Sequence, residues 1–174
     1  MSDPIPQANI NFEAYLDGKR LIGIVGVTNP TISTVTAEVK GAGISGVVDQ
    51  PIYGQIQAMS GTLEFRTITE DLNKLMGFGR LHLEFWNAVQ GIDSSNGAYD
   101  VGQHKIIWGA SFKNGNPGNL NPGEGQGRSV EFEVTYFKEI FKGKEKYEID
   151  KFNNIFRVNG VDLLSKVKQA IGLM

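Results

Sequence analysis

Residues 128–141, RSVEFEVTYFKEIF, alternate apolar and polar side chains more regularly than any other part of the chain. In an extended segment Val130, Phe132 and Val134 would lie on one face and Glu131 on the other, because successive side chains point to opposite sides of a strand. This period of two predicts a half-buried β-strand and favours a mainly β fold.

The same alternation recurs on both sides of this stretch, with turn residues between the apolar runs. Asp17-Gly18 and Asn96-Gly97 are typical of tight turns in β-hairpins. The other predicted strands cover residues 12–16, 19–27, 31–40, 56–66, 81–90, 104–112 and 144–150. Residues 113–127, KNGNPGNLNPGEGQG, consist almost entirely of turn formers and predict a flexible loop.

Two segments have helical periodicity. Residues 67–76 place Leu72 and Leu75 on one face, and Thr67 with Glu70 has the spacing of a capping box. Residues 161–171 carry a second apolar stripe. We therefore expect one domain over residues 1–174, an antiparallel β-sandwich or small barrel with one short flanking helix and a C-terminal helix.

Composition excludes several classes of protein. The 174 residues carry 17 Lys and Arg against 19 Asp and Glu, a net charge of −2, so the chain is no strongly basic nucleic-acid binder. Because it has no cysteine, disulfides, thiolate zinc sites and cysteine nucleophiles are excluded. The first ten residues lack the pattern of a signal peptide, and the apolar run at 21–27 is far shorter than the ~20 residues that span a bilayer. We expect an intracellular protein.

Candidate catalytic and cofactor motifs fail on their context. Residues 41–46, GAGISG, match a dinucleotide-binding pattern, but Pro51 follows where that motif requires a helix. His82 and His104 lie in strand patterns without metal-ligand spacing. Glu131 and Glu133 share a strand face at a separation near that of glycosidase carboxylates, a pairing that is common on solvated strands. We expect no enzyme, metal or cofactor.

Several strands carry bulky apolar side chains on both faces, although one face of a small antiparallel sheet is normally polar. Trp86 lies opposite the Leu83 side of its strand, and Ile107 opposite Trp108. Either a helix or neighbouring subunits could cover this surplus, and the second explanation predicts a homo-oligomer. In a monomer, exposed Tyr15, Trp86 or Trp108 could instead stack on sugar rings, as in a carbohydrate-binding module.

The C-terminal third resembles a known family in the order and spacing of four segments. These are residues 133–138 (EVTYFK), 146–150 (KYEID), 158–162 (VNGVD) and 171–173 (IGL). They are similar to the major tail tube proteins of contractile-tailed bacteriophages and R-type bacteriocins. The hairpin at 15–18, the connection at 40–46 and the strand containing Met59 also have counterparts, whereas the 113–127 loop is longer than the family pattern.

The resemblance implies a β-sandwich or small-barrel subunit, six of which close into a ring that stacks into a hollow tube. It implies contacts with a tail sheath protein and with baseplate or tube-initiator, tape-measure and terminator proteins. DNA would be passing cargo only, and the assembled tube would cross a target membrane. The chain would assemble in the host bacterial cytoplasm and end in a virion tail or bacteriocin particle. A tube protein of a type VI secretion machine is an alternative.

Site residues can be assigned within this expectation. Carboxylates in the lumen would avoid trapping DNA, and Glu64, Glu131 and Glu133 are the lumen candidates. Glu70 and Asp71, on the first helix, are candidates for sheath contact. The glycine-rich stretch 41–54 is the expected ring-stacking loop, with the N-terminal arm 1–10 as a second candidate. The residues singled out in this loop are Gly41, Gly43, Ile44, Gly46, Asp49 and Gln50.

Overall fold

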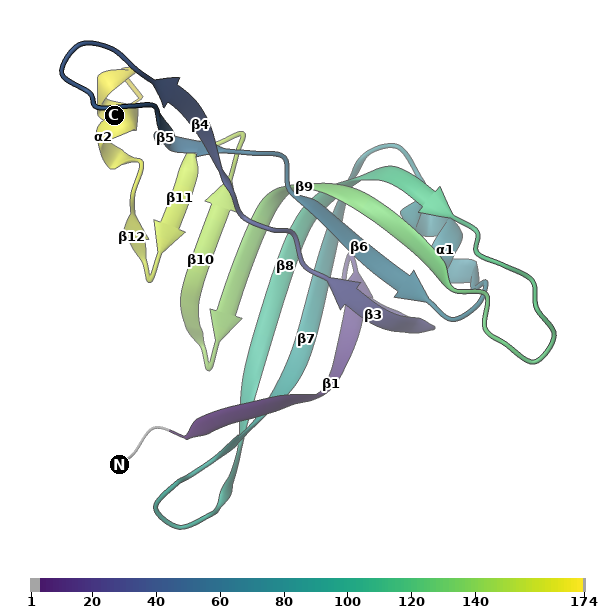
Figure 1. Cartoon of the computed structure of the whole chain (residues 1–174). Coiled ribbons are helices and arrows are strands. Elements are labelled where there is room, and N and C mark those ends of the chain that lie inside the picture. The colour runs from purple at the N-terminus through teal and green to yellow at the C-terminus, as the bar shows by residue number, and fades with distance from the viewer. Residues whose placement is uncertain (1–3, 174) are drawn as a thin grey trace.

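A computed structural model describes residues 4–173. Antiparallel β structure dominates it (Figure 1). The strands are β1 (Ile5–Leu16), β2 (Lys19–Leu21), β3 (Ile24–Thr28), β4 (Thr34–Val39), β5 (Val48–Ile56), β6 (Ser60–Phe65), β7 (Arg80–Ile92), β8 (Tyr99–Asn116), β9 (Arg128–Phe141), β10 (Lys144–Asp150), β11 (Ile155–Val158) and β12 (Val161–Asp162). The helices are α1 (Glu70–Leu75) and α2 (Ser165–Ala170).

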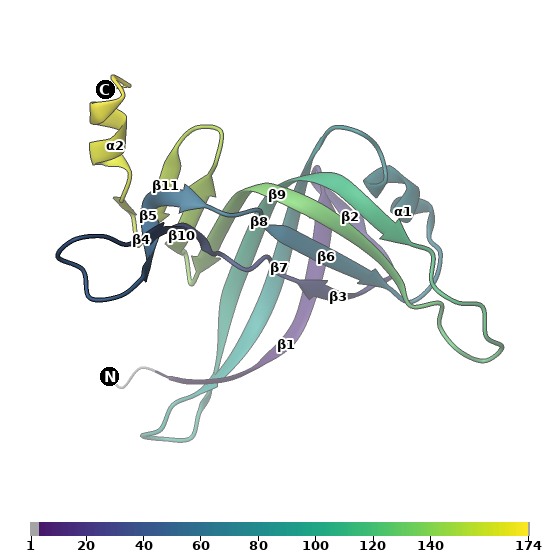
Figure 2. The same cartoon turned by 45° about the horizontal axis from the view of Figure 1, so that its top comes forward.

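Strand β9, whose existence the strict alternation predicts, joins the parts of the main sheet. It pairs with β8 on one side, whereas on the other side residues 128–133 pair with β6 and residues 136–141 pair with β10. The sheet order is β12-β11-β10-β9-β8-β7-β1-β2, and β3 joins through β6. Figures 1 and 2 show β3 and β6 crossing in front of β7 and β8, so the sheet curves into an open barrel.

The core fills the space inside this curve. Trp108, Phe132, Leu63 and Leu83 are fully buried there, each on a different strand. The Trp108 ring lies edge-on to Phe85, with ring centroids 4.7 Å apart. Aromatic and aliphatic burial of this extent is the main source of stability of a domain of this size.

The β4–β5 hairpin forms a separate two-stranded sheet outside the barrel. Figures 1 and 2 show it beside α2, at the end of the molecule away from α1. Every residue of β4 is exposed, as are the first six residues of β5. The hairpin therefore contributes to the core only at its base, where Ile56 packs against it.

The predicted loop at 41–54 is too long. Residues 48–54 belong to β5, where Val48 pairs with Val39 and Asp49 with Glu38. Pro51 is tolerated because both strands of a two-stranded sheet are edges. Asp49 and Gln50 are therefore strand residues, whereas Gly41, Gly43, Ile44 and Gly46 lie in the connection between the strands.

The predicted N-terminal arm is also largely strand. Residues 5–10 begin β1 and pair with the end of β7, while residues 1–3 of the arm lie outside the described residues. Side-chain hydrogen bonds from Asn87 to Asn9 (2.8 Å) and from Gln90 to Gln7 (2.7 Å) reinforce this pairing.

Both helices are shorter than predicted. α1 begins after Thr69. The predicted capping box between Thr67 and Glu70 is wrong, because the Thr67 hydroxyl and the Ile68 amide both donate hydrogen bonds to the Gln126 side chain instead. Residues 161–162 form β12, since Asn159 and Gly160 adopt positive φ and turn the chain back along β11. α2 therefore starts only at residue 165.

Other strand boundaries also differ from the sequence prediction. The predicted strand 19–27 divides into β2 and β3 at Gly23, whose φ is +89°. The predicted loop 113–127 loses its first residues to β8, which continues to Asn116 opposite Ser129.

Candidate functional site

The three lumen candidates lie on one face of the sheet. Residues directly opposite each other in an antiparallel pair share a face, and Thr62 pairs with Glu131 while Ser60 pairs with Glu133. Glu64 follows on the same face of β6, two residues after Thr62. The opposite face of these strands carries buried apolar side chains, so the carboxylates point away from the core.

Two lysines partly neutralise this carboxylate face. Lys113 Nζ lies 3.4 Å from Glu131, and Lys151 Nζ lies 3.6 Å from Glu133. Hydrogen bonds from Asn114 and Lys113 hold the pKa of Glu131 below its usual range. Among residues 4–173, no ion pair forms at Glu64. The face is therefore only weakly negative, with Glu64 as its unneutralised charge.

The two sheath candidates differ in what their side chains contact. Glu70 is exposed at the start of α1. A sheath contact through Asp71 would require an exposed carboxylate, but this side chain is only 19% exposed. Its carboxylate accepts hydrogen bonds from Lys74 (2.7 Å) and from the Ile22 amide (3.3 Å), and these bonds lower its pKa. Asp71 thus helps to fix α1 on the barrel.

The aromatic residues do not form a flat exposed strip. Trp108 is fully buried, Tyr15 is half-buried and Trp86 is 38% exposed. The expectation that Trp108 could stack on a sugar is wrong, because its ring fills the barrel core against Gly61. The carbohydrate-binding alternative loses one of the aromatic rings on which it depended.

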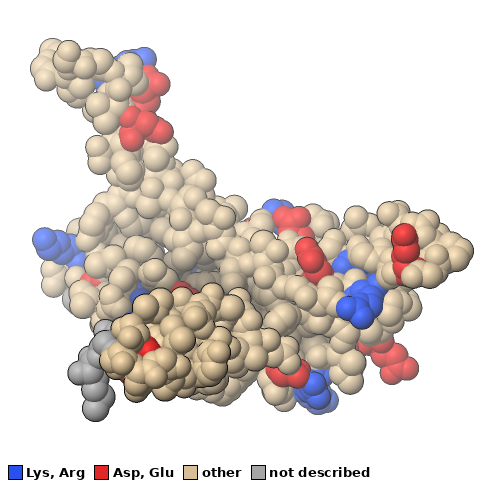
Figure 3. Space-filling view, turned by 60° about the horizontal axis from the view of Figure 1, so that its bottom comes forward, with Lys and Arg blue, Asp and Glu red and all other residues tan. Residues whose placement is uncertain are grey.

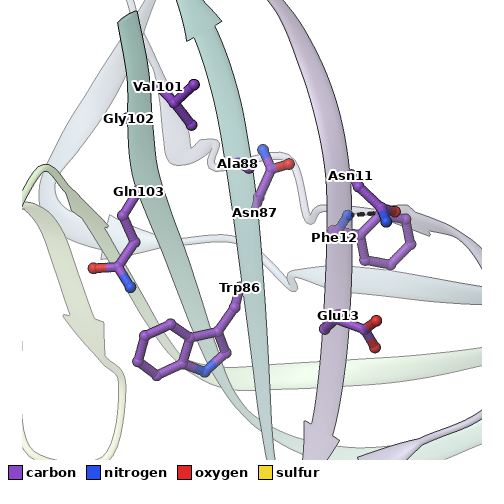
Figure 4. Close-up of a pocket in the computed structure, with 9 residues that line it drawn as sticks. All are labelled: Asn11, Phe12, Glu13, Trp86, Asn87, Ala88, Val101, Gly102 and Gln103. Atoms are coloured by element: carbon purple, nitrogen blue, oxygen red, sulfur yellow. Dashed lines mark hydrogen bonds between the residues drawn. The ribbon is translucent and has the colours of Figure 1, made fainter.

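Trp86 borders a shallow groove of about 380 Å³ on the outer face of β1, β7 and β8 (Figure 4). Glu84 accepts a hydrogen bond from the indole (3.1 Å), and Lys105 Nζ lies 4.3 Å from the ring centroid. Glu13 and Gln103 provide polar groups at the edges of the groove. These residues include no nucleophile paired with a general base.

The two histidines each contact a glutamate. His82 Nε2 lies 3.0 Å from Glu84, and His104 Nε2 lies 2.7 Å from Glu139. Within the part of the chain that the structure describes, no cluster of three or more His, Asp or Glu could hold a metal ion. Over the same residues, neither helix is long and apolar enough to span a bilayer.

The family model of the phage tail tube protein FII matches residues 6–172. The chain belongs to this family. It is therefore a structural protein of a tail tube, as the sequence resemblance predicts.

One curated relative is the tail tube protein of Escherichia phage P2, which is 26% identical over 164 residues. The alignment covers 91% of this chain and 93% of the relative. Among solved structures, the PVC sheath–tube complex of an extracellular contractile injection system contains a chain with a TM-score of 0.52 at 13% identity. That match covers 79% of this chain and 90% of the other, and it supports the tube-protein fold.

A second solved structure, the baseplate of the anti-feeding prophage (AFP), gives a TM-score of 0.48 at 9% identity. That match covers 80% of this chain and 97% of the other. The score is too low to support an argument.

Sequence reasoning missed the residues that surround the candidates. Lys113 lies in the predicted loop and Lys151 follows β10, so neither has a pattern that places it beside a glutamate of β9. The hairpin meets the C-terminal segment, residues 161–173, through contacts of Tyr53 with Leu163 and of Gly54 with Leu164, more than a hundred residues apart in sequence. Only the folded sheet brings these pairs together.

Proposed function

We propose that this chain builds the inner tube of a contractile tail, with copies closing into hexameric rings and rings stacking through the β4–β5 hairpin. The observation that carries the proposal is the hairpin itself, an exposed two-stranded sheet outside an otherwise well-packed barrel. A lone two-stranded sheet is marginally stable in water. Contact with another copy would cover it.

Sheet edges supply the lateral contacts of such a ring. In the described chain β3 pairs only with β6, and residues 5–13 of β1 pair only with β7. Each of these strands leaves one row of backbone donors and acceptors available to a neighbour. Joining the free edges of adjacent subunits would remove them, as closure does in a barrel.

The carboxylate face of β6 and β9 would line the channel in this proposal. Passing DNA would meet Glu64 as a repelling charge, while Lys113 and Lys151 reduce the total field. Two triple variants test this assignment by changing the charge of the face in two steps. Glu64, Glu131 and Glu133 are all replaced by glutamine in one variant and by lysine in the other. We expect both to form tubes and the lysine variant to slow genome delivery more. Normal delivery by the lysine variant would contradict the lumen assignment.

The remaining partners follow from the tube role. Glu70 on α1 is the stronger candidate for a basic group of the sheath, because Asp71 is already paired. Baseplate or tube-initiator, tape-measure and terminator proteins would contact the ends or interior of the tube. Assembly would occur in the bacterial cytoplasm, and the finished tube would reside in a virion tail or bacteriocin particle and cross the target membrane.

Negative-stain electron microscopy of the purified chain over a concentration series tests the proposal. We expect six-fold rings and hollow tubes, either spontaneously or after addition of tube fragments as seeds. A variant lacking residues 42–46, which lie outside both hairpin strands, should form rings without tubes. Compact monomers at every concentration with seeds present would contradict tube formation. Normal tubes from the deletion variant would contradict stacking through the hairpin.

A further inference from the structure

The β4–β5 hairpin contacts the C-terminal segment at two consecutive residues. The Tyr53 hydroxyl donates a hydrogen bond to the backbone carbonyl of Leu163. At Gly54 the backbone comes so close to Leu164 that an added Cβ would lie 2.3 Å from its Cδ2. Gly54 also has a φ of +76°, which side-chain-bearing residues rarely adopt. Only glycine fits this position without strain or collision.

The C-terminal segment is itself fixed to the barrel. The Leu163 amide bonds the Phe156 carbonyl on β11 (2.8 Å), and the Leu164 amide bonds Asp162 (3.0 Å). Lys168 of α2 contacts the same Asp162 carboxylate at 2.9 Å. Leu164 is only 6% exposed. The segment is therefore a rigid support against which β5 rests.

Beyond this contact, the hairpin is held mainly at its base. The Gln57 amide bonds the Ser33 carbonyl (2.8 Å), and Lys151 bonds the Gln57 carbonyl (2.7 Å). Ile56 at the end of β5 packs against the core, whereas the described residues 36–52 are exposed and their strand pairing lies within the hairpin. The contacts of Tyr53 and Gly54 thus control the direction in which the hairpin projects.

Exposed apolar side chains continue from the hairpin onto the C-terminal segment. They are Val35, Val39, Ile44, Val47, Val48 and Ile52 on the hairpin, and Val161, Leu163, Ile171 and Leu173 on the segment. A surface of this kind on a water-soluble chain is typical of an interaction site.

We propose that the hairpin and the C-terminal segment form one docking unit for a second copy of this chain, held in position by a latch of Tyr53, Gly54 and Leu164. The inference rests on the proposed stacking function and adds to it that Leu163 and Leu164, just before α2, set the hairpin's orientation before rings meet. A preorganised element binds more tightly because less freedom is lost on contact.

A second copy suits this surface because the opposite end of the molecule also exposes apolar side chains, beside the polar β7–β8 turn. Ile5, Tyr99 and Val101 are exposed where β1 and β8 begin and β7 ends, with Ile5 opposite Ile92 and Ile92 opposite Tyr99. Figure 1 shows this end below the barrel and the docking unit above it, and in Figure 3 the lower end comes forward with few charged atoms. Stacking one copy on the next would bring two different apolar surfaces together, as a head-to-tail contact requires.

Alanine substitutions at two glycines test the latch. Gly54→Ala introduces both backbone strain and the collision with Leu164. Gly18→Ala is the matched control, because Gly18, in the β1–β2 turn away from the docking unit, also has a positive φ (+79°) but an added Cβ would meet nothing within 4 Å. We expect Gly54→Ala to raise the concentration at which tubes appear about tenfold, as when a binding-competent state falls to a tenth of the population. Gly18→Ala should change it less than about twofold on the same scale.

The double variant Gly54→Ala with Leu164→Ala is the decisive test of the collision. Removing the Leu164 side chain leaves room for the new Cβ, so the double variant should assemble closer to the parent than Gly54→Ala does. Normal assembly of Gly54→Ala, or a defect that the double variant does not relieve, would overturn the latch. Ring formation, followed by mass photometry, should be unchanged in all variants.

Spin labels provide a second measurement on the unassembled chain. The parent has no cysteine, so Ser45→Cys and Gln169→Cys place one label on the hairpin and one on α2. The distance distribution should be narrow in the parent and broad after Tyr53→Phe or Leu164→Ala; equal breadth would contradict the latch. If deletion of residues 42–46 leaves tubes intact, the stacking function fails. If that deletion blocks tubes and the latch variants do not, only the latch fails.

Discussion

The β6–β9 part of the barrel and the β4–β5 hairpin are both antiparallel β structure, yet they use their side chains differently. In the barrel, Phe132 and Leu63 are fully buried between strands. In the hairpin, the paired residues Val39 and Val48 are both exposed. The barrel is stable through contacts within one chain, whereas the exposed apolar side chains of the hairpin would gain burial through the proposed association of copies.

The largest expected effect follows removal of a barrel side chain. Phe132→Ala should lower the free energy of unfolding by about 3–5 kcal/mol, because it leaves a cavity in the fully buried core. Urea denaturation of the unassembled chain measures this loss. A loss below about 1 kcal/mol would show that the barrel is not the stable part of the molecule.

Overpacking at Gly61 should have the next largest effect. A Cβ at this position would lie 2.6 Å from the Trp108 ring, so Gly61→Ala should cost about 1–3 kcal/mol in the same assay. Gly77→Ala is the control, because an added Cβ there would meet nothing closer than 3.9 Å. Equal stability of the two variants would contradict tight packing between β6 and β8.

Acid titration tests an ion cluster on the outer face of the barrel. Burial raises the pKa of Glu84, but hydrogen bonds from Lys105, His82 and Trp86 outweigh it and lower the pKa from 4.5 to about 2. The ionised carboxylate thus stabilises the fold fully above about pH 4.5, and this contribution is lost as the pH falls through about 2.

The Glu84→Gln variant isolates this contribution. It should cost about 1–2 kcal/mol at pH 7, less than the full shift implies, because the side chain is partly exposed to water. The difference from the parent should shrink as the pH approaches 2. A difference independent of pH would show that the cluster acts through packing alone.

Polar substitutions in the hairpin should have the smallest effect on stability. Val39→Ser with Val48→Ser should change the free energy of unfolding by less than about 0.5 kcal/mol, because both side chains are exposed. Tube formation by the same protein should be lost or strongly delayed in electron micrographs. Normal tubes would mean that the apolar surface of the hairpin is not used in assembly.

The sequence predicted the barrel well and the hairpin poorly, for a physical reason. Val130, Phe132 and Val134 are buried because they share the core-facing side of β9. An alternation of apolar and polar residues with a period of two makes that side evident in the sequence. In the hairpin, Gly41, Pro51 and Gly54 resemble loop residues, and nothing local shows that residues 48–56 pair with β4.

The candidate site was predictable only in part. The alternation placed Glu131 and Glu133 on a polar face, but their proximity to Glu64 depends on the pairing of β6 with β9. The support of the hairpin by Leu164 is equally nonlocal. Contacts between residues distant in sequence leave no periodic signal, so their assignment needed the structure.

Hydrogen–deuterium exchange on free subunits and on assembled tubes tests the central claim most directly. Residues 128–141 should be protected in both states, because β9 has strand partners on both sides within the chain. Residues 36–51, on the tip side of the latch, should exchange faster than β9 in the free subunit and become strongly protected in the tube. Rapid exchange of the hairpin in both states would contradict its role in stacking.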